Sequence, residues 1–143
     1  MSVVETHLTP DLLALLEASE LPASDLHEGR SATFLSLTSN GELQGCVGLE
    51  FSGEIAFLRS LAVRTSARGE GLGRSLVAAA EQRAQSAGSL EMYLLTTGAA
   101  PFFELLGYRR VDRKDTPAFV AASPQFRGLC PASAVLMARR LQG

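Results

Sequence analysis

The spacing of apolar residues has a period of two in the first half of the chain. Residues 32–38 and 43–51 each alternate apolar and polar positions, and Ser39-Asn40-Gly41-Glu42 between them is a strong hairpin turn signal. A second turn at Ser52-Gly53 leads into the apolar run Ile55–Val63. Three strands joined in series by tight turns predict an antiparallel meander. Alternation within the second strand puts one set of side chains on one face (Cys46, Gly48, Glu50) and another on the opposite face (Val47, Leu49, Phe51).

The period then changes to that of a helix. Apolar residues recur at helical spacing over Leu72–Ala87, at positions 72, 76, 80, 84 and 87. Gly88 follows, where a left-handed cap belongs. The pattern therefore predicts one long amphipathic helix directly behind a glycine-rich turn.

Shorter elements flank this centre. Residues 1–9 are predicted as an edge strand, and a helix follows with Thr9 as N-cap and Pro10 in its first turn. Beyond the long helix the pattern predicts, in order, a strand over 90–96, a helix over 99–106, a strand over 108–112, a long polar connection over 114–128 and a last strand over 132–139. The order predicts an α/β fold with a mixed, mostly antiparallel central sheet flanked by helices.

Length and composition narrow the class. A chain of 143 residues with 46% hydrophobic and 20% charged residues is expected to form a single domain, residues 1–143. Its net charge of −2 argues against a nucleic-acid partner. Neither a signal peptide nor an apolar stretch of about 18 residues is visible, which predicts a cytoplasmic protein without a membrane partner. Cys46 and Cys130 lie far apart and are expected to be buried free thiols, and no metal site is predicted.

The candidate chemistry lies in Arg68-Gly69-Glu70-Gly71-Leu72-Gly73, between a strand and a helix. This arrangement points free backbone N–H groups at an anion such as a phosphate. It is not a Walker A loop, because no Lys-Ser/Thr follows Gly73. A dinucleotide-binding turn also fits badly: an acid does stand at Glu91, but three antiparallel strands come first. A merely structural loop is the remaining alternative.

Two segments together carry a resemblance to a known family. Leu58–Val63 with Arg68–Leu76 resembles the acyl-CoA-binding motif of the GNAT N-acetyltransferase superfamily, and Phe102–Tyr108 resembles the aromatic segment found downstream in that superfamily. The resemblance implies the GNAT fold, acetyl-CoA (coenzyme A) as co-substrate, and direct acetyl transfer to the amine of a small molecule. A homodimer is possible in such a family. The alternative is a non-catalytic acyl-CoA sensor on the same fold.

Further segments look like the arsenic-resistance-associated branch of these acetyltransferases. They are Leu21–Leu26, Gly45–Glu50, Leu58–Val63, Tyr93–Thr97 and Gly128–Ala134. Membership of that branch implies a small amine or amino-acid substrate, such as an arsenic-containing amino acid.

The same resemblance assigns cofactor contacts by matched position. The pyrophosphate is expected at the backbone of Gly69, Glu70, Gly71, Leu72, Gly73 and Arg74, with charge added by Arg68 and Arg74. The pantetheine arm is expected along the backbone of Leu61, Ala62 and Val63, and further contacts at Thr96, Phe102 and Phe103. For the arginines the alternative is a solvated face, and for Thr96 a cap at the end of a strand.

The proton path is the least determined part. The family often places a tyrosine, as general acid, where this chain has Phe103. Either another group serves (Tyr93, Tyr108 or Cys130), or the leaving thiolate takes its proton from solvent or from the amine. Glu50 is the candidate base, with Glu54 beside it, and a salt bridge is the alternative for each. Arg59 and Cys130 are the candidate acceptor-binding residues, Arg59 through a substrate carboxylate. For Arg59 the alternative is an exposed arginine on the outer face of the sheet, and for Cys130 it is a packed cysteine.

Overall fold

The computed structural model describes residues 3–21, 32–129 and 133–141. Seven strands in these ranges form one sheet in the order β1-β2-β3-β4-β5-β7-β6. The strands are β1 (Val3–Thr6), β2 (Thr33–Ser39), β3 (Glu42–Ser52), β4 (Ile55–Val63), β5 (Glu91–Thr96), β6 (Arg109–Arg110) and β7 (Val135–Arg140). The helices are α1 (Pro10–Ala18), α2 (Leu72–Ser86), α3 (Ala100–Leu105) and α4 (Ala118–Ala121), with short helical turns at Thr65–Ala67, Arg113–Asp115 and Gln125–Leu129.

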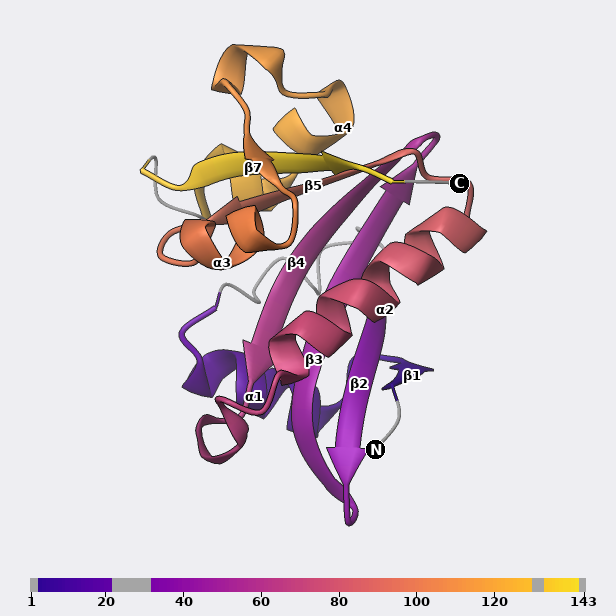
Figure 1. The fold of residues 1–143 in the computed structure, drawn as a ribbon, viewed down its shortest axis with the longest axis vertical. Coiled ribbons are helices and arrows are strands. Elements are labelled where there is room, and N and C mark those ends of the chain that lie inside the picture. The colour runs from indigo at the N-terminus through magenta and orange to yellow at the C-terminus, as the bar shows by residue number, and fades with distance from the viewer. Residues whose placement is uncertain (1–2, 22–31, 130–132, 142–143) are drawn as a thin grey trace.

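Helices cover both faces of the sheet (Figure 1). On one face α2 and α3 pack over the largest core cluster, which includes Val47, Leu58, Leu76 and Phe103. On the other face α1 packs over Phe34, Cys46 and Ala62, while Val120 of α4 packs over Phe57 and Tyr93. The alternation predicted for β3 is therefore confirmed, because Val47 and Leu49 lie toward α2 and Cys46 lies toward α1.

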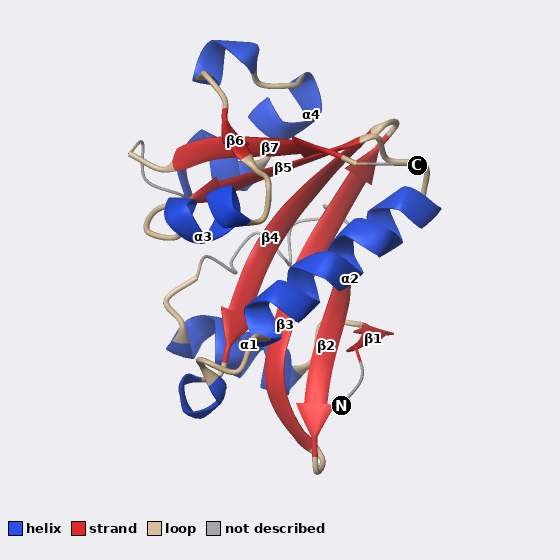
Figure 2. Cartoon of the chain, viewed as in Figure 1, coloured by secondary structure: helices blue, strands red, loops and turns tan. Residues whose placement is uncertain are grey.

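All pairings in the sheet are antiparallel except that of β4 with β5. This parallel pairing is short, because it runs only from Ile55 opposite Glu91 to Leu58 opposite Leu94. Beyond Leu58 the two strands diverge, as Figure 2 shows. The divergence leaves one edge of Arg59–Val63 without a strand partner among the described residues.

A β-bulge coincides with this divergence. Cys46 pairs with Ala62 and Gly48 with Arg59, so two residues of β4, Ser60 and Leu61, stand opposite one residue of β3. Ser60 adopts a left-handed backbone with φ of 56°. The extra residue switches the faces of β4: Leu58 packs under α2, whereas Ala62 packs under α1. Without the bulge, two positions four residues apart would share a face.

Most predicted elements are present with small shifts. Strand 55–63 and the start of the helix at Leu72 agree with the prediction, Thr9 Oγ1 accepts a hydrogen bond from Leu12 N at 3.2 Å, and Gly88 has a φ of 91°. Two predictions were wrong. The strand expected over 108–112 is only Arg109–Arg110, and the connection expected over 114–128 contains α4 and further helical turns. Proline-bounded helical turns of three to five residues are too short for apolar periodicity to reveal.

Candidate active site

A cleft of about 830 Å³ lies where β4 and β5 diverge. One wall is β4 from Phe57 to Leu61, and the other is the end of β5 with its following turn, residues 94–99. Phe103 of α3 and residues 19–21 at the end of α1 also line it. The cleft thus exposes the unpaired edge of β4, on the side where the resemblance predicts an extended ligand.

The glycine turn forms a smaller hollow of about 300 Å³ beside the cleft, and Arg68 lines both. Gly69 and Gly71 have φ of 87° and 77°, values that favour glycine. Gly71 is the N-cap of α2 and supplies no side-chain cap, so the first N–H groups of α2 are not capped by a side chain there. The N-terminus of this 15-residue helix therefore presents backbone donors and positive potential to the hollow.

Several predicted cofactor residues surround these two hollows. Arg68, Gly69, Gly71, Leu72, Gly73, Arg74, Val63 and Phe102 line the smaller one, and Leu61, Thr96 and Phe103 line the cleft. The Ala62 side chain instead packs under α1, which leaves only its backbone near the cleft. Thr96 Oγ1 accepts a hydrogen bond from Ala99 N at 3.0 Å, so the expected strand-end cap is present.

Arg59 is buried in the cleft wall by a network of its own. Its Nη1 donates to Glu50 Oε2 at 2.9 Å, and its Nε donates to Ser60 Oγ at 3.1 Å. Both charged side chains are 1% exposed. Gly48 lies opposite Arg59, and a Cβ there would come within 3.1 Å of Arg59 Cγ and of the Phe34 ring. The alternative of an exposed arginine is therefore wrong, while the salt-bridge alternative for Glu50 is confirmed.

The tyrosines lie elsewhere. Tyr93 packs against Phe57 and Leu136 and lines a separate hollow with Arg109 and Asp115, and burial raises the pKa of its phenol. Neither Tyr93 nor Glu50 is among the described residues that line the cleft, and Glu50 is held by Arg59, so the structure does not bring the two candidate catalytic residues to the cleft surface. Tyr93 packs toward Val120 of α4.

Tyr108 is likewise occupied by a structural contact. Its hydroxyl donates to Glu81 Oε2 at 2.8 Å, and Arg139 Nη1 donates to the same carboxylate at 3.1 Å. Burial, more than the Glu81 charge, raises the pKa of Tyr108. Phe103 lies between this network and the cleft, with its ring 5.6 Å from the Tyr108 ring in an edge-to-face contact. No phenol lines the cleft among the residues that the structure describes.

The other predicted residues lie in different parts of the fold. Glu54 lies in the turn before β4, at the opposite end of that strand from Val63, and its carbonyl accepts from Leu90 N at 2.7 Å. Cys46 is a buried free thiol, as predicted. Cys130 lies outside the described residues. Within the described ranges, no three potential metal-ligating side chains gather, and no helix is both long and apolar enough to cross a bilayer.

Sequence reasoning did not single out Glu20 or Gln125, two polar residues that line the cleft. They lie more than 100 residues apart in the chain, and no local motif marks them. Ser133, which belongs to the segment Gly128–Ala134 of the branch resemblance, also lines the cleft. Leu21, the first residue of the segment Leu21–Leu26 of the branch resemblance, lines the cleft as well.

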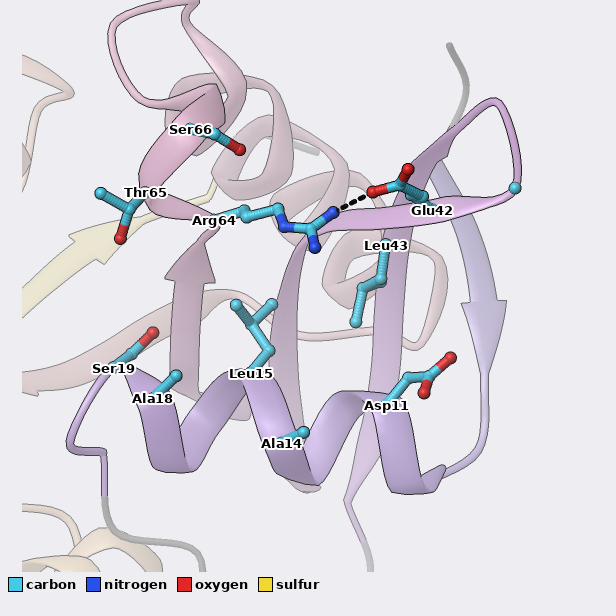
Figure 3. A pocket seen from close by; sticks show the side chains of 11 residues that line it. Asp11, Ala14, Leu15, Ala18, Ser19, Glu42, Leu43, Arg64, Thr65 and Ser66 are labelled. Atoms are coloured by element: carbon cyan, nitrogen blue, oxygen red, sulfur yellow. Dashed lines mark hydrogen bonds and ion pairs between the residues drawn. The ribbon is translucent and has the colours of Figure 1, made fainter.

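A further hollow of about 600 Å³, which we call the second hollow, lies between α1 and the end of β4 (Figure 3). Arg64 forms an exposed ion pair with Glu42 at its rim, on the side of the strands, and Asp11 lies on the α1 side. Ser19 lines both this hollow and the cleft, so the C-terminal end of α1 separates the two.

Comparison with known proteins defines the class. Residues 4–108 match the acetyltransferase (GNAT) family, and the chain belongs to that family. An uncharacterized N-acetyltransferase of Chlorobaculum tepidum is 35% identical over 78 residues, which are 54% of this chain and 50% of that protein. The chain thus spans about half the length of the curated relative it matches.

Solved structures support the same fold. N-acetylglutamate synthase from Neisseria gonorrhoeae, in complex with coenzyme A and N-acetyl-glutamate, superposes with a TM-score of 0.80 at 21% identity, over 100% of this chain and 36% of that one. An aminoglycoside 6'-N-acetyltransferase in complex with coenzyme A superposes with a TM-score of 0.75 at 20% identity. The match covers 100% of this chain and 98% of that one. At these identities the likeness concerns the fold.

Proposed function

We propose that the protein is an N-acetyltransferase that moves the acetyl group of acetyl-CoA directly to the amine of a small amino acid. The observation that carries this proposal is the cleft between diverging β4 and β5, which runs into an uncapped helix N-terminus and has a buried arginine in its wall. Family membership and the coenzyme A in structurally similar proteins support the donor.

Coenzyme A fits the two hollows in a defined direction. Its pyrophosphate takes the backbone N–H groups of residues 69–74, with Arg68 and Arg74 as counter-charges. Its pantetheine amides pair with the free edge of β4 at Leu61–Val63, as an added strand would. Phe102 and Phe103 supply the apolar wall on the α3 side.

Arg59 gives the acceptor end its specificity. A guanidinium in this wall suits a carboxylate, which it binds through paired hydrogen bonds. Glu50 and Ser60 fix the guanidinium in the cleft wall, so little side-chain entropy is lost when the ligand arrives. Glu50 is accordingly a positioning residue rather than the base. Resemblance to the arsenic-resistance-associated branch makes an arsenic-containing amino acid the first candidate acceptor.

The transfer needs no phenolic acid. The neutral amine attacks the thioester carbonyl carbon, the C–N bond forms, and the C–S bond then breaks. The thiolate leaves and takes the second amine proton from the nitrogen of the tetrahedral intermediate. A thiolate is a good enough leaving group at neutral pH for this path, which agrees with Phe103 in the cleft wall.

Calorimetric titration with acetyl-CoA tests the donor. We expect binding by the wild type and weaker binding by Gly71→Ala, because φ of 77° strains an alanine and shifts the N–H donors. Gly88→Ala is the matched control: Gly88 has a φ of 91° and open space around its Cβ position, far from both hollows. No binding to the wild type at millimolar acetyl-CoA would refute the proposal.

Thiol release tests the transfer itself. We expect turnover with amino acids or arsenical amino acids and less with amines that lack the carboxylate. Binding of acetyl-CoA without thiol release for any amine would favour the sensor alternative, for which Phe103 in place of the usual tyrosine is the specific observation.

A further inference from the structure

One charged side chain lines the cleft without a part in the proposed binding of coenzyme A or in the proposed carboxylate site at Arg59. Among the residues that the structure describes, Glu20 is the carboxylate that lines it. Glu20 follows α1, lines the cleft together with residues of β4, and is exposed to solvent. The cleft therefore has guanidinium groups at Arg59 and Arg68 and a carboxylate at the end of α1.

Glu20 occupies a position that suits its residue type badly. Leu21 N donates to Leu16 O at 3.0 Å and Glu20 N to Glu17 O at 3.1 Å, which together close α1 with a Schellman motif. The residue at this point of the motif is left-handed, and Glu20 has a φ of 57°. Glycine takes this conformation without strain, whereas a glutamate does not.

The charge of Glu20 is also unfavourable where it stands. The C-terminal end of a helix carries partial negative charge and favours cations. The last turn of α1 holds no basic residue, and both Glu17 and Glu20 are acidic. Two separate costs, backbone strain and like-sign electrostatics, thus fall on one side chain. A bound cation at this end of the helix would offset the second cost.

We infer that Glu20 is the residue that binds the ammonium group of the acceptor at the mouth of the cleft. This inference rests on the proposed function and deepens it. Arg59 receives the carboxylate of the acceptor and Glu20 its amine in the protonated form, so the site selects zwitterionic amino acids over amines that lack a carboxylate. The ammonium group then gives one proton to water, and the neutral amine attacks the thioester. The end of α1 contributes its negative potential to the same ammonium group.

Two substitutions separate this role from a merely structural one. Glu20→Gly relieves the backbone strain and removes the negative charge, so we expect a higher melting temperature. We also expect the KM for the amino-acid acceptor to rise about tenfold, which is the effect of one lost charge-assisted hydrogen bond. Glu20→Gln keeps the strain and removes the charge. It is expected to raise KM similarly with a smaller gain in melting temperature. The dissociation constant for acetyl-CoA stays within about twofold in both.

Glu17→Gln is the matched control. Glu17 is an exposed glutamate at the same helix end, and it lines neither the cleft nor the second hollow. It is expected to raise the melting temperature slightly and leave KM unchanged. The acceptor in every assay is the amino acid that the wild type turns over fastest from a panel of the twenty standard amino acids and arsenical amino acids.

The outcomes are distinct. A rise in melting temperature with unchanged KM for Glu20→Gly overturns the inference, since Glu20 would then be only a poor helix cap. An equal rise in KM for Glu17→Gln also overturns it, because the effect would belong to the helix end as a whole. If the wild type binds no acetyl-CoA or turns over no amine, the proposed function fails and this inference fails with it.

Discussion

Two arginine–glutamate pairs join β3 to the β4 region, and their surroundings are opposite. Arg59 and Glu50 meet inside the protein with both side chains 1% exposed, and Arg59 faces the cleft. Arg64 and Glu42 meet at the rim of the second hollow, with side chains 45% and 66% exposed. The pairs have the same chemistry, and only burial distinguishes them.

Burial determines what each pair contributes. An exposed pair is hydrated and screened, so it adds about 0–1 kcal/mol to the free energy of unfolding. A buried pair costs several kcal/mol per ion in desolvation, which the mutual attraction roughly offsets. Since a hydrophobic pair would stabilise the fold equally well, the buried pair adds little to stability, and the proposed binding of a carboxylate by Arg59 supplies a reason for it.

The largest expected effect follows from breaking each pair in turn. Glu50→Ala leaves the buried Arg59 uncompensated and should lower the free energy of unfolding by about 3–5 kcal/mol. Glu42→Ala should change it by less than about 1 kcal/mol. Urea unfolding measures both. Equal effects of the two substitutions would show that burial does not separate the pairs.

Removing both buried charges together sharpens the comparison. The double variant Glu50→Leu with Arg59→Met should recover most of the stability lost in Glu50→Ala, because no buried charge remains. We expect it still to bind acetyl-CoA and to lose acetylation of amino acids, by at least about a hundredfold in kcat/KM. Retained acetylation in a folded double variant would contradict the role given to Arg59.

A conservative change isolates the geometry of the guanidinium. Arg59→Lys keeps the charge and loses the planar fork, so kcat/KM for amino acids should fall about tenfold. For amines without a carboxylate the change should be small, and Arg64→Lys should affect neither substrate. Thiol-release assays on the two substrate classes provide the measurement, and a uniform fall across both classes would indicate a structural defect instead.

The smallest expected effect concerns Cys46, on β3 between Glu42 and Glu50. Burial raises the pKa of its thiol from 9.0 to about 12. Below pH 9 the thiol is protonated in both the folded and the unfolded state. Above pH 9 it ionises only when unfolded, so the free energy of unfolding falls as pH rises.

Urea unfolding at pH 9 and pH 10 measures this loss. Between these values the wild type should lose about 1 kcal/mol more than Cys46→Ala. The comparison concerns the slope with pH, which a cavity left by the alanine does not alter. Identical slopes in the two proteins would mean that the Cys46 thiol is not shielded from solvent.

Local patterns in the sequence determined the frame of this protein. Alternating apolar positions defined the hairpin and the strand Ile55–Val63, and helical spacing after Gly71 defined α2. Those signals are local because strand and helix periods come from backbone geometry within a few residues. The glycine turn was visible for the same reason, since Gly69 and Gly71 are local residues that supply the positive φ which the turn requires.

Tertiary structure alone decided what faces the cleft. Alternation placed Glu50 on a face but did not reveal its contact with Arg59, because that contact depends on the register between β3 and β4. The roles of Tyr93 and Tyr108 depended on α4 and on Glu81, and Glu20 entered the cleft through the packing of α1. Such contacts join residues far apart in the chain, and no local period encodes which of them meet.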